Sequence, residues 1–177
     1  QLLAARERRV PPGKDTKALV SWNGLMLAAM AEGGRILKDG RYLDAAGHAA
    51  AFLLDRMRQP DGRLLHGYKD GRAKFNGYLD DYACFIDGLT RLFEATGNPR
   101  WIEAAVELAG VMIDRFADAA DGGFFYTGRD HEELVVRPKE LLDNATRSGN
   151  AMAATALLRL SLLTGREDFA ESARSAL

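Results

Sequence analysis

The chain has 177 residues, of which 47% are hydrophobic and 28% are charged, a balance typical of a globular domain with a sizeable core. Its net charge of −1 argues against nucleic acid or an anionic membrane as a partner. The single cysteine, Cys84, excludes an intrachain disulfide and a cysteine-based metal site.

The lead-in segment, residues 1–16, starts as the charged tail of a helix that Pro11-Pro12-Gly13 interrupts. A 3.6-residue spacing of apolar side chains then predicts six helices. Their expected bounds are 22–38, 42–59, 80–96, 100–116, 149–163 and 167 onward. Three segments have strand character and predict short β-hairpins between the helices: 64–68, 124–127 and 134–137. Residues 1–177 are expected to form one partial domain, with both ends cut from something longer.

One unit recurs three times: a glycine that ends a helix, a short turn, and an aromatic residue followed by alanine four positions later. The copies are Gly40 with Tyr42 and Ala46, Gly97 with Trp101 and Ala105, and Gly165 with Phe169 and Ala173. Recurrence of this kind indicates an array of helical hairpins whose neighbouring copies stack.

The connections between the helices alternate in length. Within each hairpin the link is a few residues long, whereas 60–79 and about 117–148 are long excursions. Alternate connections of a hairpin array lie on opposite faces, and long ordered loops on one face are where binding usually occurs. The helices that begin near 22, 80 and 149 all start on this elaborated face, so a functional site is predicted there.

Polar and aromatic residues gather at these three helix starts, where free N–H groups and the helix dipole are available. Carboxylates, amides and aromatic rings in one mouth suit a polyhydroxylated ligand. The sequences are Ser21-Trp22-Asn23-Gly24, Asp80-Asp81-Tyr82 and Ser148-Gly149-Asn150. An alternative stays open, in which Ser21, Asp80 and Ser148 are ordinary N-caps and Trp22 and Tyr82 belong to the core.

Asp80 and Asp81 cannot by themselves be the two carboxyls of a glycosidase, since adjacent helical residues point about 100° apart. One of them could act with a carboxylate from elsewhere, such as Glu140 or Asp143. Cys84 lies in an apolar helical pattern and is predicted to be a core thiol and not a nucleophile.

The three histidines show no metal-ligand spacing, so no metal site is predicted. His48 is expected to face solvent, and His66 and His131 lie in the long excursions. His66 could approach the mouth from its hairpin, although a loop histidine at the surface is the favoured interpretation.

Glycines within the predicted helices favour close helix packing; the alternative is local fraying, or a helix C-cap in the case of Gly33-Gly34. They are Gly24, Gly33, Gly34, Gly47, Gly88 and Gly110.

Five segments, 17–25, 79–83, 122–125, 137–140 and 148–150, resemble hallmarks of the spermatogenesis-associated protein 20 family, in the family's order. The resemblance implies an all-α fold in which the helical hairpins form about half of an (α/α)6 toroid, similar to N-acylglucosamine 2-epimerases and six-hairpin glycosidases. It also implies a thioredoxin-like domain elsewhere in the parent chain. Arg147 departs from the proline that the family often has before Ser-Gly-Asn.

The site residues that the resemblance carries over are Asp80 and Asp81 for catalysis and Trp22, Asn23, Tyr82, Ser148 and Asn150 for substrate binding. The epimerase relatives use histidine as acid and base, and the three helices that start at the mouth contain none.

The function implied is carbohydrate-related, with a sugar or polyol ligand, no cofactor and no metal. The alternatives are a non-catalytic scaffold attached to the thioredoxin-like domain, or a bare helical-repeat module for protein binding. No signal peptide and no apolar run of about 18 residues is visible, so a cytoplasmic location is expected. Apolar flanks of a half ring also predict self-association of the chain.

Overall fold

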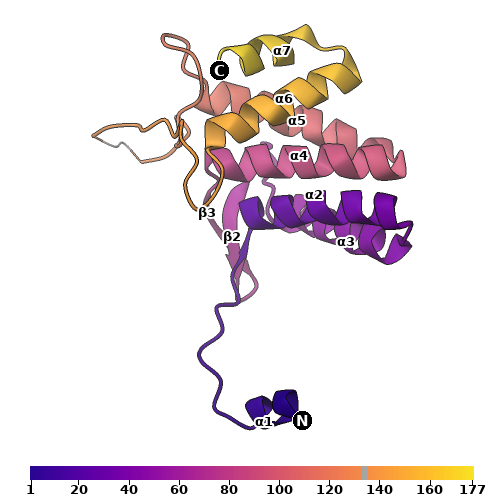
Figure 1. Ribbon diagram of the computed structural model, residues 1–177. Helices are drawn as coiled ribbons and strands as arrows, with labels where there is room; N and C mark the ends of the chain where they lie inside the picture. The colour runs from indigo at the N-terminus through magenta and orange to yellow at the C-terminus, as the bar shows by residue number, and fades with distance from the viewer. Residues whose placement is uncertain (133–134) are drawn as a thin grey trace.

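The computed structural model describes residues 1–132 and 135–177 and consists mainly of helices (Figure 1). In chain order the elements are α1 (Leu2–Glu7), β1 (Ala18–Leu19), α2 (Val20–Leu37), α3 (Gly40–Arg56), β2 (Leu65–Lys69), β3 (Arg72–Asn76), α4 (Leu79–Thr96), α5 (Pro99–Phe116), α6 (Gly149–Thr164) and α7 (Glu167–Arg174). The six predicted helices are confirmed, with bounds within three residues of those expected.

The helices form two layers. In Figure 1, α2, α4 and α6 lie side by side in one layer, and α3 and α5 lie behind them. Helix α4 is the centre of the fold: every residue from 81 to 90 is buried, including Asp81, Asp87 and Thr90. The alternation of short and long connections therefore places α2, α4 and α6 together, as the hairpin array predicts. That this layer faces the ring axis stays a prediction.

Left-handed residues end the helices of the front layer. Gly97 and Gly165 have φ values of 68° and 72° and cap α4 and α6, where a residue without Cβ adopts this conformation at little cost. The first copy of the repeat differs, because Lys38 (φ 53°) ends α2 and Gly40 is already the first residue of α3. The prediction that Gly40 ends the preceding helix is therefore wrong.

Helices α2 and α4 cross with their backbones in close contact. A Cβ on Gly24 would lie 2.6 Å from the carbonyl carbon of Cys84, and one on Gly88 would lie 2.8 Å from the carbonyl oxygen of Gly24. Close packing thus explains these two glycines. It does not explain Gly33 or Gly110, which have open space around the Cβ position.

The strands β1, β2 and β3 form a small antiparallel sheet, with Asp70 and Gly71 turning the β2–β3 hairpin. The predicted strand at 64–68 is confirmed as β2. The one predicted at 124–127 is wrong, since Phe124 makes only an isolated bridge to Ala117. Residues 135–137 are irregular, and Leu134 lies outside the described residues.

Apolar side chains remain exposed on both flanks of the front layer. The large ones are Trp22, Leu25, Met26, Ile36 and Leu37 on α2, and Leu158, Leu162 and Leu163 on α6. Self-association through these flanks stays a prediction. Within the described parts of the chain, no helix combines the length and the apolar character needed to cross a bilayer.

Candidate functional site

The three predicted helix starts converge. A small hollow of about 20 Å³ is lined by residues from the starts of α2, α4 and α6. Its walls are Ser21, Trp22, Leu25, Asp80, Cys84, Thr146, Arg147 and Met152. Two of the sequence-predicted site residues, Trp22 and Asp80, therefore line a common surface.

Asp80 is the electrostatically unusual residue of this hollow. Its Oδ1 atom is buried and has no hydrogen-bond partner among the described residues. Burial, followed by repulsion from the adjacent Asp81 carboxylate, raises the pKa of Asp80 to about 6. A carboxyl group of this kind exchanges a proton near neutral pH, as a general acid or base requires.

Asp81 lies beside Asp80 but is fully buried, with 0% of its surface exposed. Its carboxylate accepts hydrogen bonds from the backbone N–H of Ser21 and of Tyr78, each at 2.9 Å. Its Oδ2 also lies 2.7 Å from Nδ1 of His66. Asp81 thus joins the start of α2 to the start of α4 and orients a histidine, which suits a positioning role better than direct contact with a ligand.

His66 is the residue that sequence reasoning underrated. Strand β2 brings it to the start of α4, where its half-buried ring contacts Asp81. The hydrogen bond to Asp81 raises the pKa of His66 and engages Nδ1, and His66 also lines a neighbouring pocket. A signal was available: His66 lies in a predicted strand within the long excursion that leads to the Asp80-Asp81 pair.

Trp22 and Asn23 differ in their surroundings. The Trp22 side chain is 64% exposed, although large aromatic residues are usually well buried. The Asn23 side chain donates to the carbonyl oxygen of Leu19 at 2.7 Å, so it stabilises the first turn of α2. Trp22 is therefore free to stack against a ligand, whereas Asn23 is engaged locally.

The remaining predicted binding residues are engaged in the fold. Tyr82 is 1% exposed, and its hydroxyl accepts from the N–H of Leu64 at 2.8 Å. The Asn150 side chain bonds both the N–H and the carbonyl of Phe124, and so clamps the long loop to α6. Ser148 caps α6 through the N–H of Ala151.

The N-cap alternative is thus correct for Ser148 alone. Leu19 and Tyr78 precede α2 and α4, and Ser21 and Asp80 lie inside those helices. Asp143, a suggested second carboxylate, accepts from the N–H of Ser148 at 2.9 Å, and Glu140 lines a separate loop pocket.

Cys84 is confirmed as a core thiol: it is 5% exposed, and burial raises its pKa to about 12. His48 is exposed, as expected. His131 accepts from the N–H of Gly128 at 3.0 Å and packs on Tyr78. The described residues contain no group of three or more His, Cys, Asp or Glu side chains placed to hold a metal ion.

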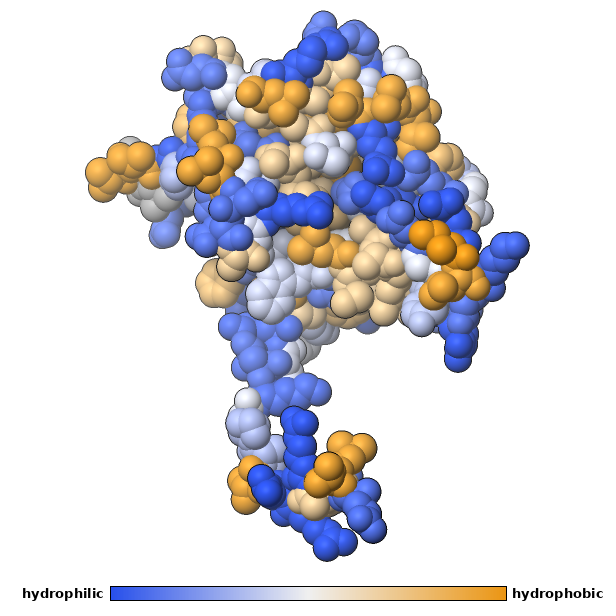
Figure 2. All heavy atoms as spheres, viewed as in Figure 1, coloured by the Kyte–Doolittle hydropathy of each residue, from blue (hydrophilic) through white to orange (hydrophobic). Residues whose placement is uncertain are grey.

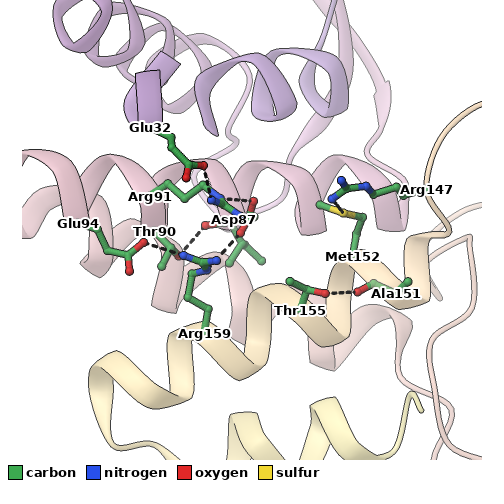
Figure 3. Close-up of polar contacts among 11 residues, drawn as sticks. Glu32, Asp87, Thr90, Arg91, Glu94, Arg147, Ala151, Met152, Thr155 and Arg159 are labelled. Carbon is green, nitrogen blue, oxygen red and sulfur yellow. Dashed lines mark hydrogen bonds and ion pairs between the residues drawn. The ribbon is translucent and has the colours of Figure 1, made fainter. Parts of the chain in front are cut away.

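Farther along the same three helices lies a second charged cluster, in which the acids are paired (Figure 3). Asp87 contacts Arg91 at 2.9 Å and Arg159 at 3.6 Å. Arg91 also pairs with Glu32, and Arg159 with Glu94, each at 2.9 Å. This network ties α2, α4 and α6 together and leaves little charge for a ligand.

Solved structures with the same arrangement of helices are (α/α) toroids. The cellobiose 2-epimerase of Spirochaeta thermophila matches with a TM-score of 0.75 at 17% identity, over 90% of this chain and 42% of that one. The GH76 α-mannanase BT2949 of Bacteroides thetaiotaomicron matches with 0.75 at 15% identity, over 96% and 44%. The unsaturated glucuronyl hydrolase of Bacillus sp. GL1 matches with 0.72 at 16%, over 95% and 48%. The chain therefore has the fold of about half of such a toroid, as predicted.

Sequence comparison identifies the relatives. Spermatogenesis-associated protein 20 of Homo sapiens is 34% identical over 179 residues, which is 96% of this chain, and the Rattus norvegicus protein is equally similar. No protein-family model matches. The chain is a homologue of spermatogenesis-associated protein 20, and it spans about a quarter of the length of these curated relatives, 23% of each. The resemblance predicted from the motifs is confirmed.

Proposed function

We propose that the starts of α2 and α4, together with strand β2, form a carbohydrate-binding site equipped for acid–base chemistry. The observation that carries the proposal is the Asp80 carboxyl, whose pKa of about 6 and unpartnered buried Oδ1 stand next to the exposed Trp22 ring. The toroid fold that the chain shares with sugar epimerases and glycosidases supports the choice of ligand class, as an analogy of fold.

Each residue of the site has a distinct task. Trp22 offers a flat apolar face on which a sugar ring can stack. Asp80 holds or gives up a proton near neutral pH, and it lines the hollow where a ligand hydroxyl would lie. His66, held by Asp81 through Nδ1, presents Nε2 as a second proton-transferring atom.

His66 also supplies a histidine near the starts of α2 and α4, although α2, α4 and α6 contain none. The lack of histidine in these helices gave no support for epimerase-like proton abstraction, but here β2 brings His66 to the start of α4. Asp81 is a positioning residue in this scheme, since it touches His66 and the backbone rather than the open hollow.

The test is sugar binding by the full-length protein, measured by calorimetry against a panel of mono- and disaccharides. Asp80→Asn and Trp22→Ala are each expected to weaken binding at least about tenfold, the loss that about 1.4 kcal/mol produces. The matched control is Asp44→Asn, an exposed aspartate on α3, which should bind as the wild type does. Absence of any binding sugar, or normal binding by both site variants, would overturn the proposal.

A further inference from the structure

A larger pocket adjoins the hollow on the side of the sheet. Its volume of about 660 Å³ lies in the range of small-molecule sites. The residues that line it are Lys17, Leu19, His66, Gly67, Lys69, Asp70, Arg72, Lys74 and Phe75. Four of these nine are cations and one is an acid, in a chain whose net charge is −1.

The pairing of the strands explains why the cations gather. Lys69 pairs with Arg72, and Gly67 pairs with both Lys74 and Leu19, so these positions share one face of the sheet. Lys17 lies two residues before Leu19, so strand alternation places it on the same face. In Figures 1 and 2, the narrow region where the sheet leaves the helical body is covered by hydrophilic residues.

These cations are poorly neutralised. Lys17 pairs with the exposed Asp15 at 3.2 Å. Within the described parts of the chain, the recorded ion pairs include none for Lys69, Arg72 or Lys74. Like charges directly opposite on neighbouring strands destabilise a sheet, so the arrangement costs stability when no anion is bound.

Protection of a sheet edge accounts for only part of the pattern. Lysine on an edge strand commonly blocks pairing with another chain, and this could explain Lys74 on β3. Strand β2 is the central strand, but β1 pairs only with Gly67 and Tyr68, so Lys69 lies beyond the end of β1 and is open on that side. Edge protection gives no reason, however, for four cations to line one pocket.

Phe75 adds an aromatic ring to the pocket from a strained backbone position. Its φ of 63° is in the left-handed region, which is rare for a bulky residue, and its side chain is 73% exposed. Backbone strain that keeps an apolar ring in solvent is typical of ligand-binding positions. A ring beside ammonium groups suits a ligand with both a flat face and a negative charge.

The pocket is joined to the acid–base site through one side chain. His66 lines the pocket, and its Nδ1 contacts Asp81, whose carboxylate also binds the N–H of Ser21 on the wall of the hollow. Leu19 and Trp22, three residues apart at the start of α2, line the pocket and the hollow respectively. The two spaces are therefore neighbours.

We propose that this pocket binds the anionic group, a carboxylate or a phosphate, of an acidic sugar whose ring reaches His66 and Asp80. The proposal rests on the carbohydrate function proposed above and narrows its substrate class. Lys69, Arg72 and Lys74 would supply charge-assisted hydrogen bonds to the anion, and Phe75 would cover a face of the sugar.

Calorimetry on the full-length protein tests this with four ligands: glucose, glucuronate, glucose 6-phosphate and inorganic phosphate. At least one of the two acidic sugars is expected to bind ten times more tightly than glucose, and the stronger of the two identifies carboxylate or phosphate as the preferred group. The Lys69→Gln/Lys74→Gln double variant should lose this preference, while Lys14→Gln, a lysine exposed in the lead-in segment, should keep it. Circular dichroism checks that each variant is folded.

The two proposals fail in different ways. Equal binding of glucose and both acidic sugars, unchanged in the double variant but weakened by Trp22→Ala, overturns the anion pocket and leaves the carbohydrate site standing. Lysine-dependent binding of inorganic phosphate, with sugar binding insensitive to Trp22→Ala and Asp80→Asn, overturns the carbohydrate site and with it the acidic sugar. Absence of binding by all four ligands overturns the anion pocket.

Discussion

Both ends of the layer formed by α2, α4 and α6 carry acidic residues. Arginines neutralise them at one end and not at the other. Toward the helix C-termini, the buried Asp87 is matched by Arg91 and Arg159, and these arginines are matched by Glu32 and Glu94. At the N-termini two aspartates are adjacent, and the nearest titratable base is a histidine.

The difference separates a structural role from a functional one. A paired network has lost most of its free charge, because each carboxylate lies near a guanidinium. Asp80, by contrast, stays in an environment that disfavours its charged form, which lowers the stability of the fold without an evident structural return. Perturbed carboxyls of this kind cluster at functional sites, and the chain places this one at the end with the long loops.

The largest expected effect is on the link between the helix starts. Asp81→Asn should lower the free energy of unfolding by about 3 kcal/mol, because the amide has one acceptor oxygen and its NH2 group would face a backbone N–H of Ser21 or Tyr78. Urea denaturation measures the loss. The exposed Asp44→Asn is the control and should change stability by less than about 0.5 kcal/mol. Stability of Asp81→Asn within that margin would show that Asp81 does not hold α2 to α4.

The opposite end should respond less strongly. Asp87→Asn is expected to cost about 2 kcal/mol, since Arg91 and Arg159 are partly exposed and keep Glu32 and Glu94 as partners. Asp114→Asn makes a matched control, because Asp114 forms an exposed pair with Arg115 and exposed pairs contribute little. Equal losses in the two variants, measured by urea denaturation, would contradict a structural role for the network.

Asp80→Asn should raise the free energy of unfolding, whereas Asp81→Asn and Asp87→Asn lower it. Its folded pKa of about 6 lies above the ordinary value of 3.8, so the folded state holds the proton more tightly and stability falls as pH rises from 3.8 to 6. Above that window Asp80→Asn is expected to be more stable than the wild type by about 1 kcal/mol, a value reduced from the full shift because the side chain is partly exposed.

Denaturation at pH 4 and pH 7.5 tests the Asp80 prediction. The wild type should lose more stability than Asp80→Asn over this interval. His66 contributes in both proteins with the same sign, because its raised pKa favours folding at low pH and this gain is lost as pH rises through the folded pKa. Identical pH dependence in the two proteins would refute the raised pKa of Asp80.

The helices were predictable because their determinants are local. Apolar spacing and the left-handed glycines Gly97 and Gly165 identify them without tertiary information. The strand predicted at 124–127 failed for a tertiary reason: the backbone of Phe124 bonds the side chain of Asn150 instead of a partner strand.

The site was only partly predictable. The convergence of Trp22 and Asp80 followed from loop lengths, since these decide which helix ends meet. The partners of Asp81 are three-dimensional: Ser21 is 60 residues away in sequence and His66 is 15, so no spacing rule links them. Likewise, Asn150 and Tyr82 stand in a site motif but are engaged with the backbone of Phe124 and Leu64.

The smallest expected effect is the response to salt, and it bears directly on the comparison of the two ends. Apart from Asp87, the network side chains are partly exposed, from 24% for Arg91 to 46% for Glu32, so added salt should screen their attraction. The Asp80–Asp81 repulsion lies in a buried region and is screened much less. Raising the salt concentration from about 0.05 M to about 1 M should therefore destabilise the wild type by roughly 0.5 kcal/mol relative to Asp87→Asn, which lacks the Asp87 ion pairs and keeps only the Arg91–Glu32 and Arg159–Glu94 pairs. Comparing the two proteins cancels the general effects of salt on folding. If Asp87→Asn shows the same salt dependence as the wild type, the ion pairs of Asp87 contribute no net attraction, and the contrast between Asp87 and Asp80 is then one of geometry alone.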